Sequence, residues 1–226
     1  MTAAPGDALA SAALRLARRF HAGATLWCWS PVWPSHAEHI AVEFIHPVIV
    51  GKPALPAVAL PANDAAARLR RSARTGDVFL AIGSGTDAGM LDIIARAPAW
   101  GIEPIWLAHG NEPPGGTGAC VVWLGPDAEA ADVVCAYHLL WELTHVCFEH
   151  PGVLEVADQG SVCPACSDAG DLGEVQKATD GANANVIVAG RRQRVDLTLV
   201  GPCEAGELVM VHAGVAITKL AGAARG

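Results

Sequence analysis

Between residues 24 and 149, short apolar runs alternate with segments that have helical spacing. The apolar runs are ATLWCW at 24–29, AVAL near Val58, DVFLAIG at 77–83, IEPIWLAHG at 102–110 and ACVVWLG at 119–125. The intervening segments at 33–46, 63–74 and 86–97, and a long one at 127–149, are expected to be helices. Apolar strands that alternate with helices predict a parallel sheet with helices on both faces, so we expect an α/β fold here.

The pattern changes after Gly152. Short Val-rich runs follow, separated by Gly, Asp and Asn: GEVQKAT, NVIVAG, QRVDLTLVG, GELVMVHAG and VAITKL. Frequent turn residues between short strands are typical of a small all-β barrel. Because Pro151 and Gly152 interrupt the preceding helix, we predict two domains, an α/β domain at 1–152 and a barrel at 161–222.

Composition limits the class of protein. The chain has 226 residues, of which 52% are hydrophobic and 17% charged, enough to bury a core. Apolar runs end well before the length that spans a membrane, so we expect no transmembrane helix. The segment ALASAALRLARRF is either a targeting peptide or a first helix; its helical spacing and lack of a continuous apolar stretch favour the helix. A cytoplasmic location is therefore expected, with most of the seven cysteines as free thiols.

Charge argues against nucleic acid as a partner. The net charge is −8, and no basic cluster is interleaved with aromatic residues. The run RLRRSAR at 68–74 is expected to be the solvated face of one short helix.

Cys163 and Cys166 form a Cys-x-x-Cys pair that has several interpretations. A zinc ribbon needs a second such pair, and the only later cysteine is Cys203. A redox dithiol of the thioredoxin type begins a helix in a βαβ unit, whereas strands are expected here. A thiol ligand for another centre remains, and Cys166 is equally compatible with a packed core thiol.

The segment RVDLTLVGPCEAGELVMVHAGVAITKL at 194–220 resembles the HypC/HupF family of hydrogenase maturation chaperones. Members of that family are small OB-like barrels that carry an iron atom with cyanide and carbonyl ligands. They work with the protein HypD and hand the iron to the hydrogenase large subunit. The resemblance therefore implies this iron unit as cargo, and a HypD-like protein and a hydrogenase large subunit as partners.

The same resemblance implies the iron-binding residues. The family pairs a cysteine with the histidine of its Val-His-x-Gly strand, which is His212 here. The subfamily pattern Cys-x-x-Cys-Ser-Asp places the cysteine at Cys163, with Cys166 as a further candidate. Thiolate and imidazole suit iron, and cyanide and carbon monoxide occupy positions that the protein need not fill.

Residues 5–150 resemble SIS (sugar isomerase) domains, nearest to the phosphoheptose isomerases, through GDVFLAIGSGTDAGMLDIIARAPAWGIEPIWLAHG and SHAEHIAVEF. The family's His-x-x-x-Glu pair, which binds zinc in some members, is matched by His39 and Glu43. The expected helix at 127–149 offers His138, Glu142 and His145 on one face. A second metal, zinc or iron, is therefore implied, although these residues are equally compatible with ordinary half-buried polar groups. SIS domains pair through their helices, so a homo-oligomer is also implied.

The phosphate loop of that family is matched in part, by Ser84 and Thr86, which are candidate ligand-binding residues. Asp87 beside them would repel a phosphate, and Pro31, Trp33 and Pro34 replace a glycine-rich loop. Proline removes N–H donors and bulky residues keep the backbone away from a ligand, so sugar-phosphate isomerisation is disfavoured.

Three classes of function follow. The leading hypothesis is a fused hydrogenase maturation factor, with a SIS-like α/β domain joined to an iron-carrying barrel. The alternative is an enzyme whose SIS domain acts on a small metabolite or phosphosugar and is docked to the maturation machinery by the barrel. The third is an interaction scaffold without metal.

Overall fold

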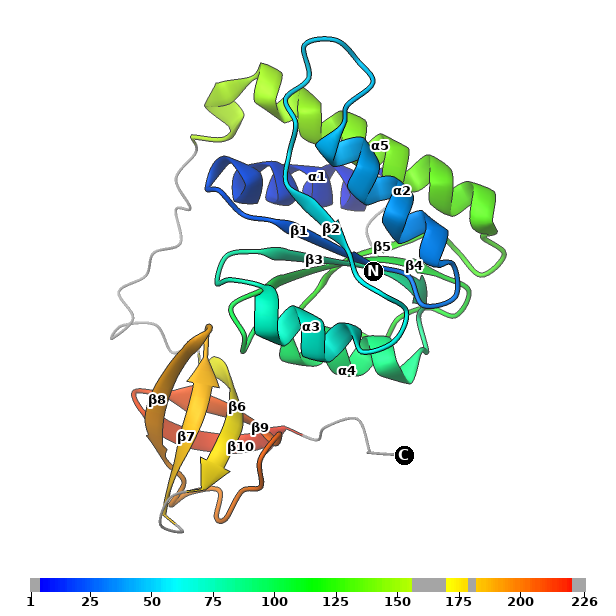
Figure 1. Ribbon diagram of the computed structural model, residues 1–226. Coiled ribbons are helices and arrows are strands. Elements are labelled where there is room, and N and C mark those ends of the chain that lie inside the picture. The colour runs from blue at the N-terminus through cyan, green and yellow to red at the C-terminus, as the bar shows by residue number, and fades with distance from the viewer. Residues whose placement is uncertain (1–4, 156–169, 179–181, 221–226) are drawn as a thin grey trace.

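The computed structural model describes residues 5–155, 170–178 and 182–220, which form an α/β body and a smaller barrel (Figure 1). The strands of the α/β body are β1 (Leu26–Trp29), β2 (Ala57–Ala59), β3 (Val78–Ser84), β4 (Glu103–His109) and β5 (Cys120–Trp123). Its helices are α1 (Pro5–His21), α2 (Pro34–Ile45), α3 (Ala65–Ser72), α4 (Ala88–Arg96) and α5 (Ala130–Glu149), followed by the 3-10 turn η1 (Pro151–Val153).

The five strands form one parallel sheet in the order β2-β1-β3-β4-β5. The central strands β3 and β4 are buried along almost their whole length, which explains their continuous apolar sequence. Two hydrophobic cores lie on opposite faces of this sheet. One is built with α1, α2 and α5, and the other with α3 and α4. The predicted parallel sheet with helices on both faces is therefore confirmed.

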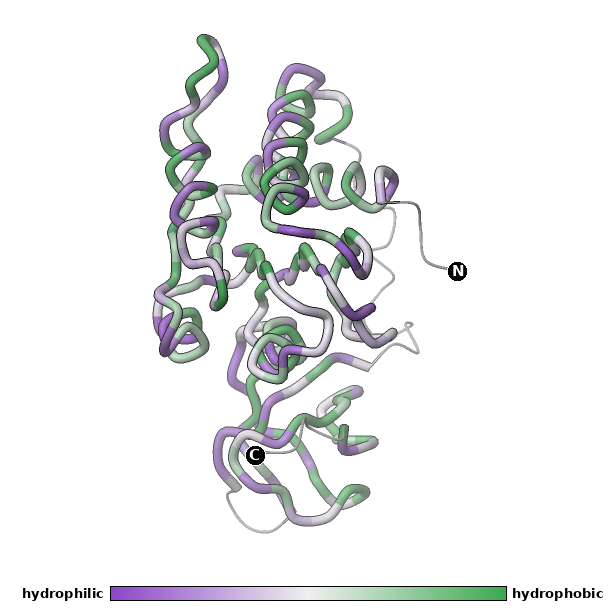
Figure 2. The backbone as a smooth tube through the Cα atoms, turned by 90° about the vertical axis from the view of Figure 1, so that its right-hand side faces the viewer, coloured by the Kyte–Doolittle hydropathy of each residue, from purple (hydrophilic) through white to green (hydrophobic). Residues whose placement is uncertain are grey.

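The layers are clear from the side, where the sheet lies between the two groups of helices and hydrophobic and hydrophilic residues alternate along the helices (Figure 2). The N-terminal segment is the helix α1, which buries Leu9, Leu16 and Phe20 at the predicted spacing. Arg15 and Arg19 of this helix pair with Glu103 at the start of β4. None of the helices in the described ranges is long and apolar enough to cross a membrane.

The second body is a closed barrel with the strand order β10-β8-β7-β6-β9. Its strands are β6 (Asp171–Ala178), β7 (Asn183–Val188), β8 (Arg191–Asp196), β9 (Leu208–His212) and β10 (Val215–Leu220). Val175, Val186, Val195 and Val209 fill its core. The predicted small all-β barrel is confirmed.

The barrel packs against the side of the α/β body that carries α3 and α4. Glu174 on β6 is only 2% exposed, and both Arg96 and Arg70 form ion pairs with its carboxylate. The indole N–H of Trp100 donates a hydrogen bond to the same carboxylate. Arg70 therefore belongs to an interdomain contact, so the predicted solvated face of the arginine run is only part of its role.

The turn between β7 and β8 makes a second contact with the α/β body. The Gly190 N–H donates to the Ala99 carbonyl at 2.8 Å. Gly190 has a φ of 76°, and a Cβ there would lie 2.2 Å from Thr75 Oγ1. Only glycine fits this turn, because any side chain would push the two bodies apart.

The described α/β elements end at Val153, and the barrel strands begin at Asp171. The predicted iron ligands Cys163 and Cys166 belong to the segment that precedes the barrel. This segment, residues 156–169, lies outside the described residues.

Candidate functional site

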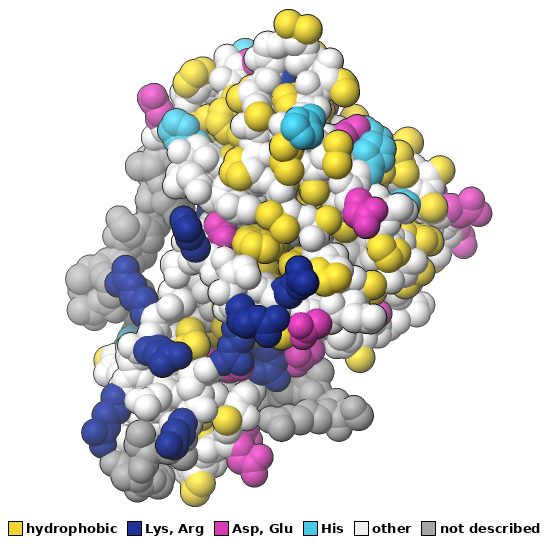
Figure 3. All heavy atoms as spheres, viewed as in Figure 1, with side chains coloured by type: hydrophobic (Ala, Val, Ile, Leu, Met, Phe, Trp, Pro, Cys, Tyr) yellow, Lys and Arg dark blue, Asp and Glu magenta, His cyan; other side chains and the backbone are white. Residues whose placement is uncertain are grey.

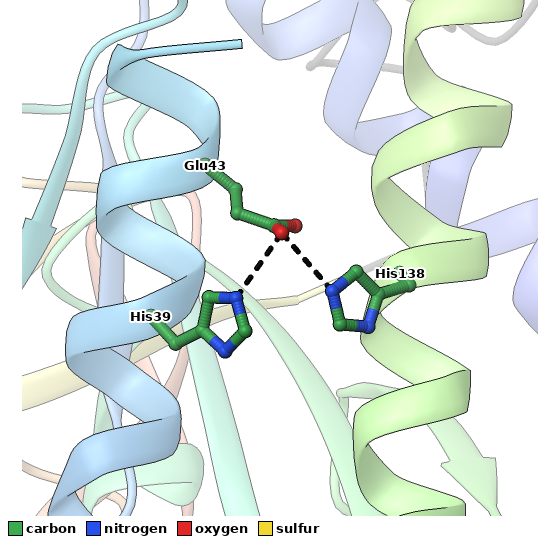
Figure 4. Close-up of side chains that lie close together, drawn as sticks. All are labelled: His39, Glu43 and His138. Atoms are coloured by element: carbon green, nitrogen blue, oxygen red, sulfur yellow. Dashed lines mark hydrogen bonds and ion pairs between the residues drawn. The ribbon is translucent and has the colours of Figure 1, made fainter. Parts of the chain in front are cut away.

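Three of the predicted metal ligands lie together between α2 and α5 (Figure 4). His39 and Glu43 lie one turn apart on α2, and His138 faces them from α5. The Glu43 Oε1 atom is 3.1 Å from His39 Nε2 and 3.0 Å from His138 Nε2. One ligand atom from each residue lies within 4.8 Å of the other two. The sequence predicted the pair on α2, and the packing of the two helices selects the third residue.

Packing of α5 on α2 holds this cluster. The Trp141 indole N–H donates to the Glu43 carbonyl at 3.0 Å, which ties the two helices together. The Tyr137 hydroxyl is 3.0 Å from His39 Nδ1. His138 Nδ1 is 2.7 Å from the Val134 carbonyl, so the tautomer that is protonated at Nδ1 can donate to this carbonyl and offer the Nε2 lone pair to a cation. Such partners orient metal-binding imidazoles in known sites.

The geometry and charge of the cluster suit a divalent cation. In a tetrahedral zinc site with bonds of about 2.0–2.1 Å, neighbouring ligand atoms are about 3.3 Å apart. The distances from Glu43 Oε1 to the two imidazole nitrogens, 3.1 and 3.0 Å, approach that value. One carboxylate and two imidazoles also match common zinc ligands, and three protein ligands leave a fourth position for water or a substrate.

Tyr137 was not predicted as part of the site. Burial, together with the nearby Glu43 charge, raises the pKa of its hydroxyl, which therefore stays protonated at neutral pH. It is the only tyrosine of the chain and directly precedes His138. Its position beside a candidate ligand was the only available signal in the sequence, and its partner His39 lies 98 residues away.

Two other predicted metal ligands lie apart from the cluster. His145 is fully buried, and its ring nitrogens lie 2.9 Å from the Trp141 carbonyl and 3.1 Å from the Pro53 carbonyl. Both nitrogens face carbonyl oxygens of the protein, and the tautomer decides which of the two carbonyls accepts the ring N–H. Glu142 is half exposed and lies 3.8 Å from Lys52. It lines an open hollow of about 570 Å³ beside Glu43 and His138.

The loop after β3 contains Ser84 and Thr86. Their hydroxyl groups are 3.3 Å apart, and Asn111 donates to the Thr86 hydroxyl at 3.4 Å. Asp87 accepts a hydrogen bond from the Met90 N–H at 2.8 Å and so forms the N-cap of α4. The carboxylate that would repel a phosphate thus has a structural role as a helix cap.

Trp33 lies at the carboxyl edge of the sheet, where ligands bind in many open α/β folds. Its ring stacks on His36 and on His109, with ring centroids 5.3 Å and 4.7 Å away. Burial lowers the pKa of both histidines, and the nearby His39 and His109 lower that of His36 further. Neutral imidazoles packed on an indole make this part of the edge aromatic and uncharged.

In the barrel, His212 is the last residue of β9 and is half buried. Asp171 lies opposite Val211 in the antiparallel ladder of β6 and β9, so continuing this register sets Gly170 beside His212. His212 therefore lies where the segment that contains Cys163 and Cys166 joins the barrel. Among the described cysteines, Cys28, Cys120, Cys135, Cys147 and Cys203 are free thiols.

Comparison with known proteins supports both predicted resemblances. Residues 172–224 match the model of the HupF/HypC family. A phosphoheptose isomerase from Francisella tularensis has a similar structure, with a TM-score of 0.52 and 19% identity, over 62% of this chain and 84% of that chain. This likeness shows that the α/β body has the SIS fold.

The search of curated proteins found no match to the chain. Two further solved structures are similar to it, with lower TM-scores. The phosphoheptose isomerase GmhA from Neisseria gonorrhoeae has a TM-score of 0.45 and 22% identity, over 63% of this chain and 85% of that chain. The Vibrio vulnificus NanR protein complexed with ManNAc-6P has a TM-score of 0.45 and 20% identity, over 63% of this chain and 56% of that chain.

Proposed function

We propose that this protein is a hydrogenase maturation factor whose barrel carries or transfers the iron–cyanide–carbonyl unit of [NiFe]-hydrogenase. The match of the barrel to the HupF/HypC family supports a role in hydrogenase maturation at the level of the family. The finer proposal is carried by the position of His212 beside Gly170. Cys163 lies seven positions before Gly170, a chain length that spans about 25 Å at most, so the thiol is within reach of the imidazole.

The proposed iron pair is Cys163 and His212, with Cys166 as a secondary ligand. A thiolate and an imidazole supply two donors to iron, and the diatomic ligands complete its coordination. Binding to iron would also keep the thiol deprotonated at neutral pH. A HypD-like protein and the hydrogenase large subunit are the proposed partners for loading and delivery.

The test is iron content and hydrogenase maturation in a host that makes [NiFe]-hydrogenase. Cys163→Ala should abolish both, and Cys166→Ala should weaken them less. Because neither residue lies in the described fold, the far-UV circular dichroism of each variant serves as the folding control. Unchanged iron and maturation in Cys163→Ala would remove Cys163 from the site.

The cluster of His39, Glu43 and His138 favours a second candidate function. We propose a zinc or iron site in the α/β body, with one open coordination position on the metal. A small metabolite could bind at this position, and the protein would then act on it as an enzyme. Purified protein should then hold metal beyond that of the barrel, and His39→Ala/Glu43→Ala should lose it. If the wild type holds no such metal and the double variant matures hydrogenase normally, the cluster is structural.

A ketose phosphate is a poor candidate for this pocket. Asp87 places a carboxylate at the start of α4, and Trp33 with its two stacked histidines occupies the carboxyl edge of the sheet. We expect neither isomerisation of sedoheptulose or fructose phosphates nor thermal stabilisation by them. Clear turnover of either compound would make the enzyme the leading proposal.

We also propose a homo-oligomer formed through α2 and α5. Large hydrophobic side chains are exposed along this side of the body: Val42, Ile45, Val48, Ile49, Val50 and Leu139. Sedimentation of the wild type and of Val48→Glu tests this, since a charge in an apolar interface should dissociate the oligomer. A monomeric wild type would overturn it.

A further inference from the structure

More than half of the positive charges of the chain belong to three elements, of which one lies about 100 residues before the other two in the sequence. The chain has 15 Lys and Arg residues against 23 Asp and Glu residues. Eight of the cations belong to the α3 segment and to β6 and β8: Arg68, Arg70, Arg71, Arg74, Lys177, Arg191, Arg192 and Arg194. All eight are exposed. The helix α3, with the turn after it, and the strands β6 and β8 thus hold more than half of the cations of an acidic protein.

These segments meet at the junction of the two bodies. The Arg70 guanidinium donates a hydrogen bond to the side-chain oxygen of Gln176 on β6, and also pairs with Glu174. Seen from the front, dark-blue Lys and Arg side chains extend without a large interruption from α3 onto the barrel (Figure 3). We call this region the basic surface and define it by Arg70, Arg71, Arg74, Lys177, Arg192 and Arg194.

The barrel half of the basic surface is hollowed. A depression of about 380 Å³ is lined by Gln176, Lys177, Asn185, Arg192, Gln193 and Arg194. Asn185 pairs with Arg194 across β7 and β8, on the opposite face from the buried Val186 and Val195. The depression therefore presents guanidinium, ammonium and amide groups together, on strands whose inner faces are fixed by the core.

We propose that the basic surface docks an acidic face of a protein partner. Arginine forms bidentate hydrogen bonds with carboxylates, and the outward-facing amide of Asn185 can bond to a partner backbone. Clustered charge of one sign also speeds association with a surface of the opposite sign. A partner bound to the basic surface contacts both α3 and the barrel. It therefore binds this protein only while the barrel is docked on the α/β body.

The surroundings favour an acidic protein over a nucleic acid. None of the residues that line the depression is aromatic, so the described lining offers no ring on which bases could stack. The chain as a whole carries a net charge of −8, which repels a long polyanion that extends beyond the basic surface. A compact acidic patch matches the size of the surface without meeting that repulsion. Docking of an acidic partner here goes beyond the proposed function and does not depend on iron binding.

The test measures binding of two fluorescent probes to the full chain by anisotropy, a dodeca-glutamate peptide and a dodeca-thymidine oligonucleotide. The peptide should bind more tightly than the oligonucleotide, and its affinity should fall as salt rises. Lys177→Gln/Arg192→Gln should weaken peptide binding about tenfold, because two exposed charge contacts are lost. Arg15→Gln/Lys219→Gln removes the same charge at two positions that do not line the depression and is the matched control, expected to bind like the wild type.

Three results would overturn the proposal. The first is absence of peptide binding at low ionic strength. The second is an equal loss of affinity in the control variant, which would mean that only net charge matters. The third is tighter binding of the oligonucleotide than of the peptide, which would assign the surface to nucleic acid. Circular dichroism spectra like that of the wild type show that each variant is folded.

Discussion

Replacing Glu174 with glutamine should undock the barrel from the α/β body. The Glu174 carboxylate is 2% exposed, and its Oε1 atom lies 3.4 Å from Arg96 Nη1 and 3.5 Å from Arg70 Nη1. Glutamine keeps the volume and can still accept from Trp100, but the charge that the two arginines face is lost. Removing one partner of a buried ion pair destabilises by about 3–5 kcal/mol.

The expected magnitude is smaller than that full range. The side chains of Arg96 and Arg70 are 15% and 40% exposed, so water can solvate them once the charge is gone. Arg96 also keeps Asp92 and the Gly206 carbonyl as partners. We therefore expect a loss of about 2–3 kcal/mol, which is a reduction of about 30–150-fold in the docking equilibrium.

Hydrogen exchange measures this equilibrium at one interdomain amide. The Gly190 N–H donates to the Ala99 carbonyl only while the barrel is docked. Exchange of the peptide that contains Gly190 should therefore accelerate in Glu174→Gln, while peptides from β3 keep the wild-type rate. Asp171→Asn, the same chemical change at an exposed position of β6, is the control. Unchanged exchange at Gly190, or equal acceleration in β3, would refute the reasoning.

Three further predictions concern individual side chains. Tyr137→Phe removes the hydroxyl beside His39 Nδ1 and should lower zinc affinity about 10–100-fold in competition with a chromophoric chelator; equal affinity would deny Tyr137 an orienting role. Burial lowers the pKa of His109 below its ordinary 6.5, so below that pH the unfolded chain binds protons first and stability falls. Urea midpoints at pH 7.5 and 5.5 should differ less in His109→Gln than in the wild type, and an unchanged difference would contradict this. Asp87→Ala should lower the unfolding free energy by about 1 kcal/mol through loss of the α4 cap, whereas Asp87→Asn should keep it; equal losses in both variants would contradict the capping role.

The fold was largely predictable because its signals are local. Continuous apolar runs such as VFLAIG mark strands buried on both faces, and short runs between glycines mark the barrel. The spacing of His39 and Glu43 likewise follows from one turn of a single helix. Such patterns need no knowledge of distant contacts.

The rest of the candidate site depends on packing between distant segments. The sequence offers three equally suitable candidate ligands on α5, namely His138, Glu142 and His145. Only the position at which α5 crosses α2 brings His138 to Glu43. The stacking of Trp33 on His109 joins a loop to the end of β4, 76 positions apart by number. Arg70 was predicted to be solvated because nothing near it in sequence reveals that Glu174 lies beside it.

The central proposal is that the barrel carries iron with cyanide and carbonyl ligands, and infrared spectroscopy tests it most directly. Protein purified anaerobically from a hydrogenase-competent host should show cyanide and carbonyl stretching bands. The bands should disappear in Cys163→Ala and in His212→Ala, while His39→Ala/Glu43→Ala keeps them. A wild-type protein without these bands, or bands that persist unchanged in Cys163→Ala, would contradict the proposal.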